Sequence, residues 1–127
     1  MSVAFEDGKI VSVESQSAKA EHFHNSIILP GFIDLHTHGR LGQDTGKIDS
    51  DLLLKYARTG TTAFLPSFCK ADLSYLMSWL DKAEKLKESL PKGVAEILGA
   101  HIEGPFIDPR NRGGIKEADC ILPTQVS

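Results

Sequence analysis

The sequence lacks three features that would place it in a special class of protein. It has no apolar run long enough to cross a membrane, few cysteines, and no excess of basic residues. The 14 basic and 17 acidic residues give a net charge of -3, so we expect neither nucleic acid nor a membrane as a partner. The amino-terminal residues have no basic start followed by an apolar core, so no signal peptide is expected and a cytoplasmic location is the default.

Cysteine is represented only by Cys69 and Cys120. Their spacing matches neither a Cys-x-x-Cys motif nor a zinc ribbon, so we interpret both as reduced thiols. Cys69 follows an expected strand and could approach a site there. The favoured interpretation is a simple buried thiol, because free cysteines are commonly buried.

The 127 residues, 41% hydrophobic and 24% charged, have the composition of a globular protein with one core. Two segments are expected. In residues 1–29, two short β-like runs flank Asp7-Gly8, a strong hairpin signal. In residues 30–127, strand and helix patterns alternate, which predicts an α/β fold with parallel strands.

The alternating segment contains three expected strands and two expected helices. Capping residues, glycines and prolines mark most of the boundaries. The first elements are a short buried strand from Phe32, a glycine-rich loop over 41–47, and a helix capped by Asp49-Ser50 and ended by Gly60. A strand over Thr61–Pro66 and a helix opened by Asp72 and ended by Pro91 follow. The last elements are a strand from Val94 to Glu103 and a loop tail with one helical turn near Lys116–Asp119. On the second helix a core-facing apolar stripe includes Leu76, Met77, Trp79 and Ala83.

The run Pro-Gly-Phe-Ile-Asp-Leu-His-Thr-His-Gly, residues 30–39, is the most informative motif. Side chains alternate along a strand, so Asp34, His36 and His38 share one face. Polar groups gathered beside an aliphatic face need partners, and a metal ion would supply one. An exposed His-x-His pair without ligand function is the alternative, but the Pro-Gly-Phe-Ile-Asp lead-in favours a ligand pair.

A second motif, His-Ile-Glu-Gly-Pro-Phe, occupies residues 101–106. Continued alternation from Ile97 would place His101 and Glu103 on one face, with Glu103 at the carboxyl end of a strand. Sites of parallel α/β proteins are built at that end. The alternative for Glu103 alone is a loop-capping role.

Together with Gly60-Thr-Thr-Ala-Phe-Leu-Pro-Ser67, these motifs resemble, in the same order, the N-acetylglucosamine-6-phosphate deacetylases of the amidohydrolase superfamily. The resemblance implies the first three parallel strands and two helices of an incomplete (β/α)₈ barrel, preceded by part of a small β-sandwich. A complete barrel needs about 250 residues. The resemblance also implies that His36, His38 and Glu103 are metal ligands, and that further His ligands and a catalytic Asp lie beyond Ser127.

The implied activity is metal-dependent hydrolysis of the N-acetyl group of N-acetylglucosamine 6-phosphate, an amino-sugar phosphate. The ligands suit a divalent transition metal, zinc above all, with Fe, Co and Mn as alternatives. Asp34 and His101 are candidates to orient the ligands, and Arg110 and Arg112 are candidates to contact a phosphate. The family usually has a His where Ile115 stands.

Two other functions remain open at this point. One is a related amidohydrolase acting on cyclic amides or N-acyl amino acids, although the Glu of the second motif argues against it. The other is a catalytically inactive truncated fragment. The unpaired edges of a three-stranded parallel sheet also predict a homo-oligomer.

Overall fold

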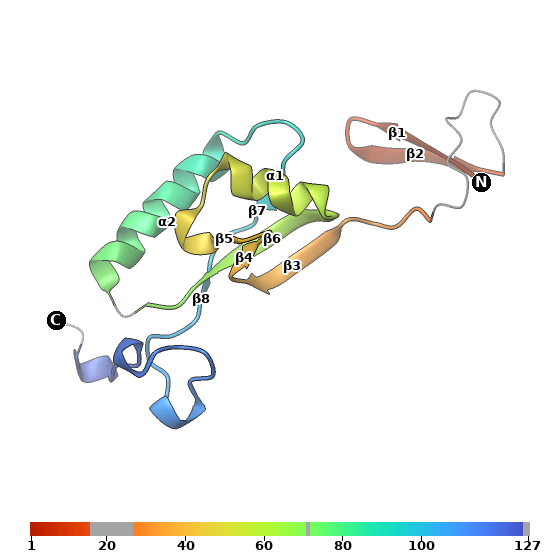
Figure 1. Cartoon of the computed structure of the whole chain (residues 1–127). Coiled ribbons are helices and arrows are strands. Elements are labelled where there is room, and N and C mark those ends of the chain that lie inside the picture. Colours follow the sequence, from red (N-terminus) through yellow and green to blue (C-terminus); the bar gives the residue numbers. More distant parts are fainter. Residues whose placement is uncertain (16–26, 71, 126–127) are drawn as a thin grey trace.

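A central parallel sheet flanked by two helices organises most of the chain (Figure 1). The structure is a computed structural model that describes residues 1–15, 27–70 and 72–125. The sheet consists of β3 (Phe32–Thr37), β6 (Thr61–Phe68), β7 (Glu96–Ile97) and β8 (His101–Ile102), and the helices are α1 (Ser50–Arg58) and α2 (Leu73–Glu88). Strand β6 is central and pairs in parallel with the other three. The predicted mixed α/β fold is therefore confirmed.

The amino-terminal residues form an antiparallel hairpin of β1 (Ser2–Glu6) and β2 (Lys9–Glu14). Both turn residues have positive φ, 49° at Asp7 and 74° at Gly8, as a two-residue hairpin turn of the favoured hand requires. The hairpin prediction is confirmed. Figure 1 shows the hairpin standing away from the sheet. The predicted first segment also includes residues 16–26, which lie outside the described residues.

Both predicted helix starts are confirmed by their capping hydrogen bonds. The Asp49 carboxylate accepts from the Leu52 N–H at 3.0 Å, and the Asp72 carboxylate accepts from the Tyr75 N–H at 3.0 Å. Helix α1 ends before Gly60, as predicted, with φ of 87° at that glycine. Helix α2 ends at Glu88, three residues earlier than the prediction from Pro91.

The core lies between the helices and the sheet. Aromatic rings fill its centre. The ring centroids of Tyr56 and Phe64 are 4.0 Å apart in a stacked arrangement, and those of Phe68 and Trp79 are 4.9 Å apart. Leu76, Trp79 and Ala83 supply the buried stripe of α2; the other core residues are Ile48, Leu52, Leu53, Ala95 and Ile97. Met77 is 59% exposed, so its place in the predicted stripe was wrong.

The third predicted strand is broken into β7 and β8. Ile97 packs in the core, whereas His101 and Glu103 contact polar groups on β3 and β6. The prediction that Ile97 shares a face with His101 and Glu103 was therefore wrong. The reason is that the interruption at residues 98–100 breaks the two-residue period on which it relied.

Strand β3 is not the buried strand that its apolar sequence predicts. Phe32, Ile33 and Leu35 are 60%, 63% and 61% exposed. Among the described residues β3 pairs only with β6, so one edge and part of a face have no neighbour.

Short elements fill the connections. The predicted loop over 41–47 lies mainly in a small antiparallel pair, β4 (Gly39–Arg40) with β5 (Gln43–Asp44), and a 3₁₀ turn, η1 (Thr45–Lys47). In the tail, η3 (Glu117–Asp119) confirms the predicted turn, and η2 (Pro109–Asn111) and η4 (Pro123–Gln125) are additional. No helix within the described residues is both long and apolar enough to span a membrane.

Candidate metal centre

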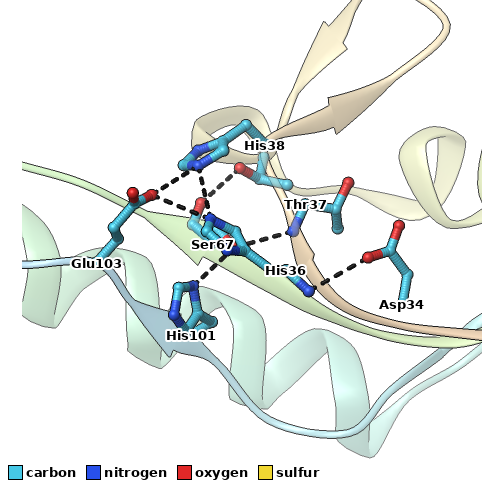
Figure 2. Close-up of polar contacts among 8 residues, drawn as sticks. Asp34, His36, Thr37, His38, Ser67, His101 and Glu103 are labelled. Atoms are coloured by element: carbon cyan, nitrogen blue, oxygen red, sulfur yellow. Dashed lines mark hydrogen bonds and ion pairs between the residues drawn. The ribbon is translucent and has the colours of Figure 1, made fainter. Parts of the chain in front are cut away.

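Three side chains from the two sequence motifs converge at one end of the sheet (Figure 2). His36 Nε2 lies 3.1 Å and His38 Nε2 lies 2.8 Å from the same oxygen, Oε2 of Glu103. The two Nε2 atoms are 3.3 Å apart. Two imidazole nitrogens and a carboxylate oxygen, all within 4.8 Å of one another, form a group that could hold a metal ion.

The strand arrangement explains this convergence. His36 lies near the end of β3 and His38 just beyond it, on the same side, while Thr37 between them turns the other way and its hydroxyl lies 2.7 Å from the Tyr56 hydroxyl of α1. Glu103 follows β8, and its N–H donates to the Phe68 carbonyl at the end of β6. Because β3, β6 and β8 are parallel, their carboxyl ends meet at the same edge.

The three groups are partly accessible and electrostatically matched. The His36, His38 and Glu103 side chains are 52%, 46% and 29% exposed. Partial burial acts to raise the pKa of Glu103, but hydrogen bonds and charge interactions with the two imidazoles outweigh it and lower the pKa. The carboxylate is therefore held in its ionised form, which is the form that binds a cation.

The two candidate orienting residues occupy different places. The Asp34 carboxylate accepts from the His36 backbone N–H at 3.2 Å and has no hydrogen bond to an imidazole ring. His101 packs its ring against that of His36 at 4.3 Å and places Nδ1 3.0 Å from Ser67 Oγ. Of the two, only His101 touches a ligand ring.

The candidate phosphate residues are engaged elsewhere. Arg110 pairs with Asp108 at 2.7 Å, which lowers the pKa of Asp108. Arg112 lies 3.9 Å from Glu117, and its Nε is buried without a hydrogen-bond partner. These contacts stay within the loop after the second motif and do not bring either arginine to the three converging side chains. Ile115, in the same loop, is 8% exposed and packs as an ordinary apolar residue.

A pocket of about 320 Å³ adjoins the triad and includes His38 in its wall. Cys69 also lines it as a half-buried free thiol, whose pKa is raised by burial. Lys47 and Lys70 add two cationic side chains. Asp44 also lines the pocket, so it offers space, two cationic groups and one carboxylate beside the triad.

Sequence reasoning missed Ser67, which is 1% exposed and lies between β3 and β8. Its hydroxyl accepts from the Thr37 N–H at 3.0 Å and meets His101 on its other side. A signal was available, since Ser67 is the polar residue at the carboxyl end of an otherwise apolar central strand.

Similarity to known proteins covers nearly the whole chain. It is 32% identical to the N-acetylglucosamine-6-phosphate deacetylase of Bacillus subtilis, across 98% of this chain and 34% of that protein. It is 31% identical to the N-acetylgalactosamine-6-phosphate deacetylase of Escherichia coli O157:H7, across 84% of this chain and 29% of that protein. No protein-family profile matches the chain.

A solved structure supports the same relationship. The crystal structure of N-acetylglucosamine-6-phosphate deacetylase from Thermotoga maritima superposes with a TM-score of 0.76 at 32% identity, across 97% of this chain and 32% of that one. The chain thus spans about a third of the length of the relatives it matches.

Proposed function

We propose, on the premise that this chain is homologous to the N-terminal region of the N-acetylglucosamine-6-phosphate deacetylases, that it forms the first part of a metal-dependent amide hydrolase. The reaction would convert N-acetylglucosamine 6-phosphate and water to glucosamine 6-phosphate and acetate. The observation that carries the proposal is the convergence of His36 Nε2, His38 Nε2 and Glu103 Oε2. In this proposal residues 1–29 contribute to a small β-sandwich, and the first three strands of a (β/α)₈ barrel are β3, β6 and the interrupted strand formed by β7 and β8.

The donor set fits a divalent transition metal. Neutral imidazoles and a carboxylate are typical ligands of zinc, and also of Fe(II), Co(II) and Mn(II). When bound, such an ion supplies Lewis-acid polarisation of an amide carbonyl and lowers the pKa of water. His36, His38 and Glu103 would hold it beside the 320 Å³ pocket, whose wall includes His38.

The chain's own residues perform the positioning part of this chemistry. Hydrogen bonds from the His36 and Thr37 backbone N–H groups hold the main chain that carries the two imidazoles, and the ionised Glu103 supplies the negative charge. Lys47 and Lys70 are the cationic residues that line the pocket, and they are better placed than Arg110 and Arg112 to meet an anionic substrate. A positioned proton-transfer group contributes about 10²- to 10⁴-fold to such reactions.

Elemental analysis of protein purified without chelator tests the metal site. We expect a transition metal at partial occupancy, since three ligands make a weak site, and we expect His36→Ala with His38→Ala to remove it. The chain offers a matched control in its other His-x-His pair, because His22→Ala with His24→Ala should leave the metal content unchanged. Equal loss in both double variants would contradict the proposal.

Turnover tests the reaction itself. We expect the isolated 127-residue chain to release no amino sugar above background even with added zinc, because the nearby acidic side chains are already engaged. Glu103 belongs to the triad, Asp34 accepts from the His36 N–H, and Asp44 accepts from the Gly46 N–H. A longer protein that also carries segments equivalent to the other two thirds of the relatives should be active. Robust metal-dependent turnover by the 127 residues alone would show that the proton-transfer group lies within these residues, which would contradict the proposal.

A second sugar has a specific observation in its favour, the similarity to an N-acetylgalactosamine-6-phosphate deacetylase. The two substrates differ only in the configuration of one ring hydroxyl. Comparing kcat/KM for N-acetylglucosamine 6-phosphate and N-acetylgalactosamine 6-phosphate in the longer protein decides between them. We expect a preference for the glucosamine derivative, and a reversed preference would assign the second sugar.

A further inference from the structure

Ser67 connects the two motifs that supply the candidate ligands. It lies near the end of β6, between the carboxyl end of β3 and the start of β8. Its side chain is buried, and its Oγ is 3.0 Å from the Thr37 nitrogen and 3.0 Å from His101 Nδ1. The Ser67 carbonyl also accepts a 2.7 Å hydrogen bond from the Thr45 hydroxyl, which fixes the backbone at this point.

The hydrogen atoms of this network can be assigned from donor and acceptor counts. A backbone N–H only donates, so Ser67 Oγ accepts from Thr37. The hydroxyl carries one hydrogen of its own, and His101 Nδ1 is the other polar atom with which Ser67 Oγ interacts in the described structure. A buried hydroxyl hydrogen without an acceptor would cost free energy, so the hydroxyl donates to Nδ1. A neutral His101 ring, whose Nδ1 accepts from Ser67, then carries its single N–H hydrogen on Nε2.

We propose that Ser67 is a positioning residue that holds His101 as the Nε2–H tautomer and fixes the Thr37 peptide between His36 and His38. Nδ1 is occupied by the serine and Nε2 carries a hydrogen, so His101 is a donor that packs on His36 rather than a fourth metal ligand. This role agrees with the absence of His101 from the converging group of His36, His38 and Glu103. Its consequence for metal binding rests on the proposed function, whereas the tautomer does not.

The tautomer can be measured without metal and without activity. We would label the histidines of the 127-residue chain with ¹⁵N and record imidazole spectra about two pH units above the ordinary His pKa of about 6.5. We expect the His101 ring to show a protonated Nε2 and an unprotonated Nδ1. Ser67→Ala should shift the ring toward a mixture of tautomers, and Ser67→Thr, which keeps a hydroxyl, should restore the single form.

Zinc titration of the same proteins provides the second measurement. Loss of a group that orients ligands typically weakens metal binding by about 10- to 100-fold, which is the expected effect of Ser67→Ala. Ser78→Ala, an equivalent change on the exposed face of α2, should leave both tautomer and affinity unchanged.

Every outcome decides the proposal. A wild-type ring with its hydrogen on Nδ1 overturns it, as does a Ser67→Ala variant with unchanged tautomer and affinity. If Ser67→Ala fails to fold, the wild-type tautomer alone supports or overturns the assignment. If the wild-type chain binds none of Zn(II), Fe(II), Co(II) and Mn(II), the proposed metal site fails, while the tautomer measurement still tests the role of Ser67.

Discussion

Strands β3 and β6 are neighbours with similarly apolar sequences, but they have opposite surroundings. Phe64 of β6 is fully buried, between Tyr56 and the rest of the core, whereas Phe32 of β3 is 60% exposed. β6 is paired on both edges, with β3 on one side and β7 and β8 on the other, while the described part of the chain gives β3 only one partner. An apolar sequence therefore shows that a strand can be buried, and the elements packed beside the strand determine whether it is buried.

The sharpest test of this difference compares the same substitution on the two strands. Phe64→Ala should lower the free energy of unfolding by about 3–5 kcal/mol, because it removes a buried ring and leaves a cavity. Phe32→Ala should change it by less than about 0.5 kcal/mol, as expected of an exposed site. Urea denaturation measures both. Equal losses would show that β3 is covered in solution.

Self-association is the next expected consequence of the exposed strand. The open edge and apolar side chains of β3 should pair copies of the chain at micromolar concentrations, which light scattering would detect as species larger than the monomer. Leu35→Lys should shift the population to monomer. Met77→Lys makes the same change at a similarly exposed position of α2 and should leave assembly intact. A monomer across a wide concentration range would contradict the prediction.

A smaller effect is expected at the one side-chain hydrogen bond between α1 and β3. Tyr56→Phe removes the hydroxyl that lies 2.7 Å from Thr37 Oγ1 and should cost about 1 kcal/mol of stability. Tyr75→Phe is the control, because its hydroxyl donates to Gly46 over a longer distance, 3.4 Å, at an exposed position. Thermal unfolding of the two variants should separate them, and identical values would assign no stabilising role to this contact.

The helix that covers β6 depends on its amino-terminal cap. Asp49→Ala should lower stability by about 1 kcal/mol at neutral pH. The hydrogen bond from the Leu52 backbone lowers the pKa of Asp49 below its ordinary value of 3.8 more than burial raises it. A carboxylate with a lowered pKa stabilises the fold above its unfolded pKa, and that contribution is lost as the pH falls through the lower folded value.

The difference between wild type and Asp49→Ala in urea should therefore shrink on acidification below about pH 4. Asp51→Ala, which removes an exposed carboxylate of the first turn of α1 and its ion pair with Lys55 but leaves the cap in place, is the control and should cost a few tenths of a kcal/mol. A difference that is constant with pH would mean that the ionised carboxylate is not the cap.

Local chemistry made part of the fold predictable. The Asp7-Gly8 turn and the caps at Asp49 and Asp72 act over two or three residues, so their effects could be derived without the tertiary structure. The same holds for the alternation that places His36 and His38 on one side of β3. The approach of Glu103 to that pair followed from the order of the strands and from the family resemblance together.

Other features depend on contacts that a sequence pattern does not contain. The break between β7 and β8 changes which residues face the core, and the sequence analysis predicted one continuous strand through Gly99 instead. The side chains of β3 are exposed because, among the described residues, the strand pairs only with β6. Arg110 and Arg112 were candidates by charge alone, but nearby acidic residues in the folded loop already pair with them.

The bonds around Thr37 hold the carboxyl end of β3 through side chains of two other elements, whereas the entry of the strand is held by the backbone hydrogen bond from Phe32 to the Gly60 carbonyl and a 3.3 Å bond from the Thr62 hydroxyl. The Thr37 N–H donates to Ser67, its hydroxyl contacts Tyr56, and just beyond it the His38 carbonyl accepts from the Thr45 N–H at 2.9 Å. Local opening of this edge strand should therefore begin near Phe32 and should not extend to His36 and His38. Amide hydrogen exchange should be faster at the entry to the strand than at Thr37. The two histidines would then keep their spacing while the first residues of the strand open and close.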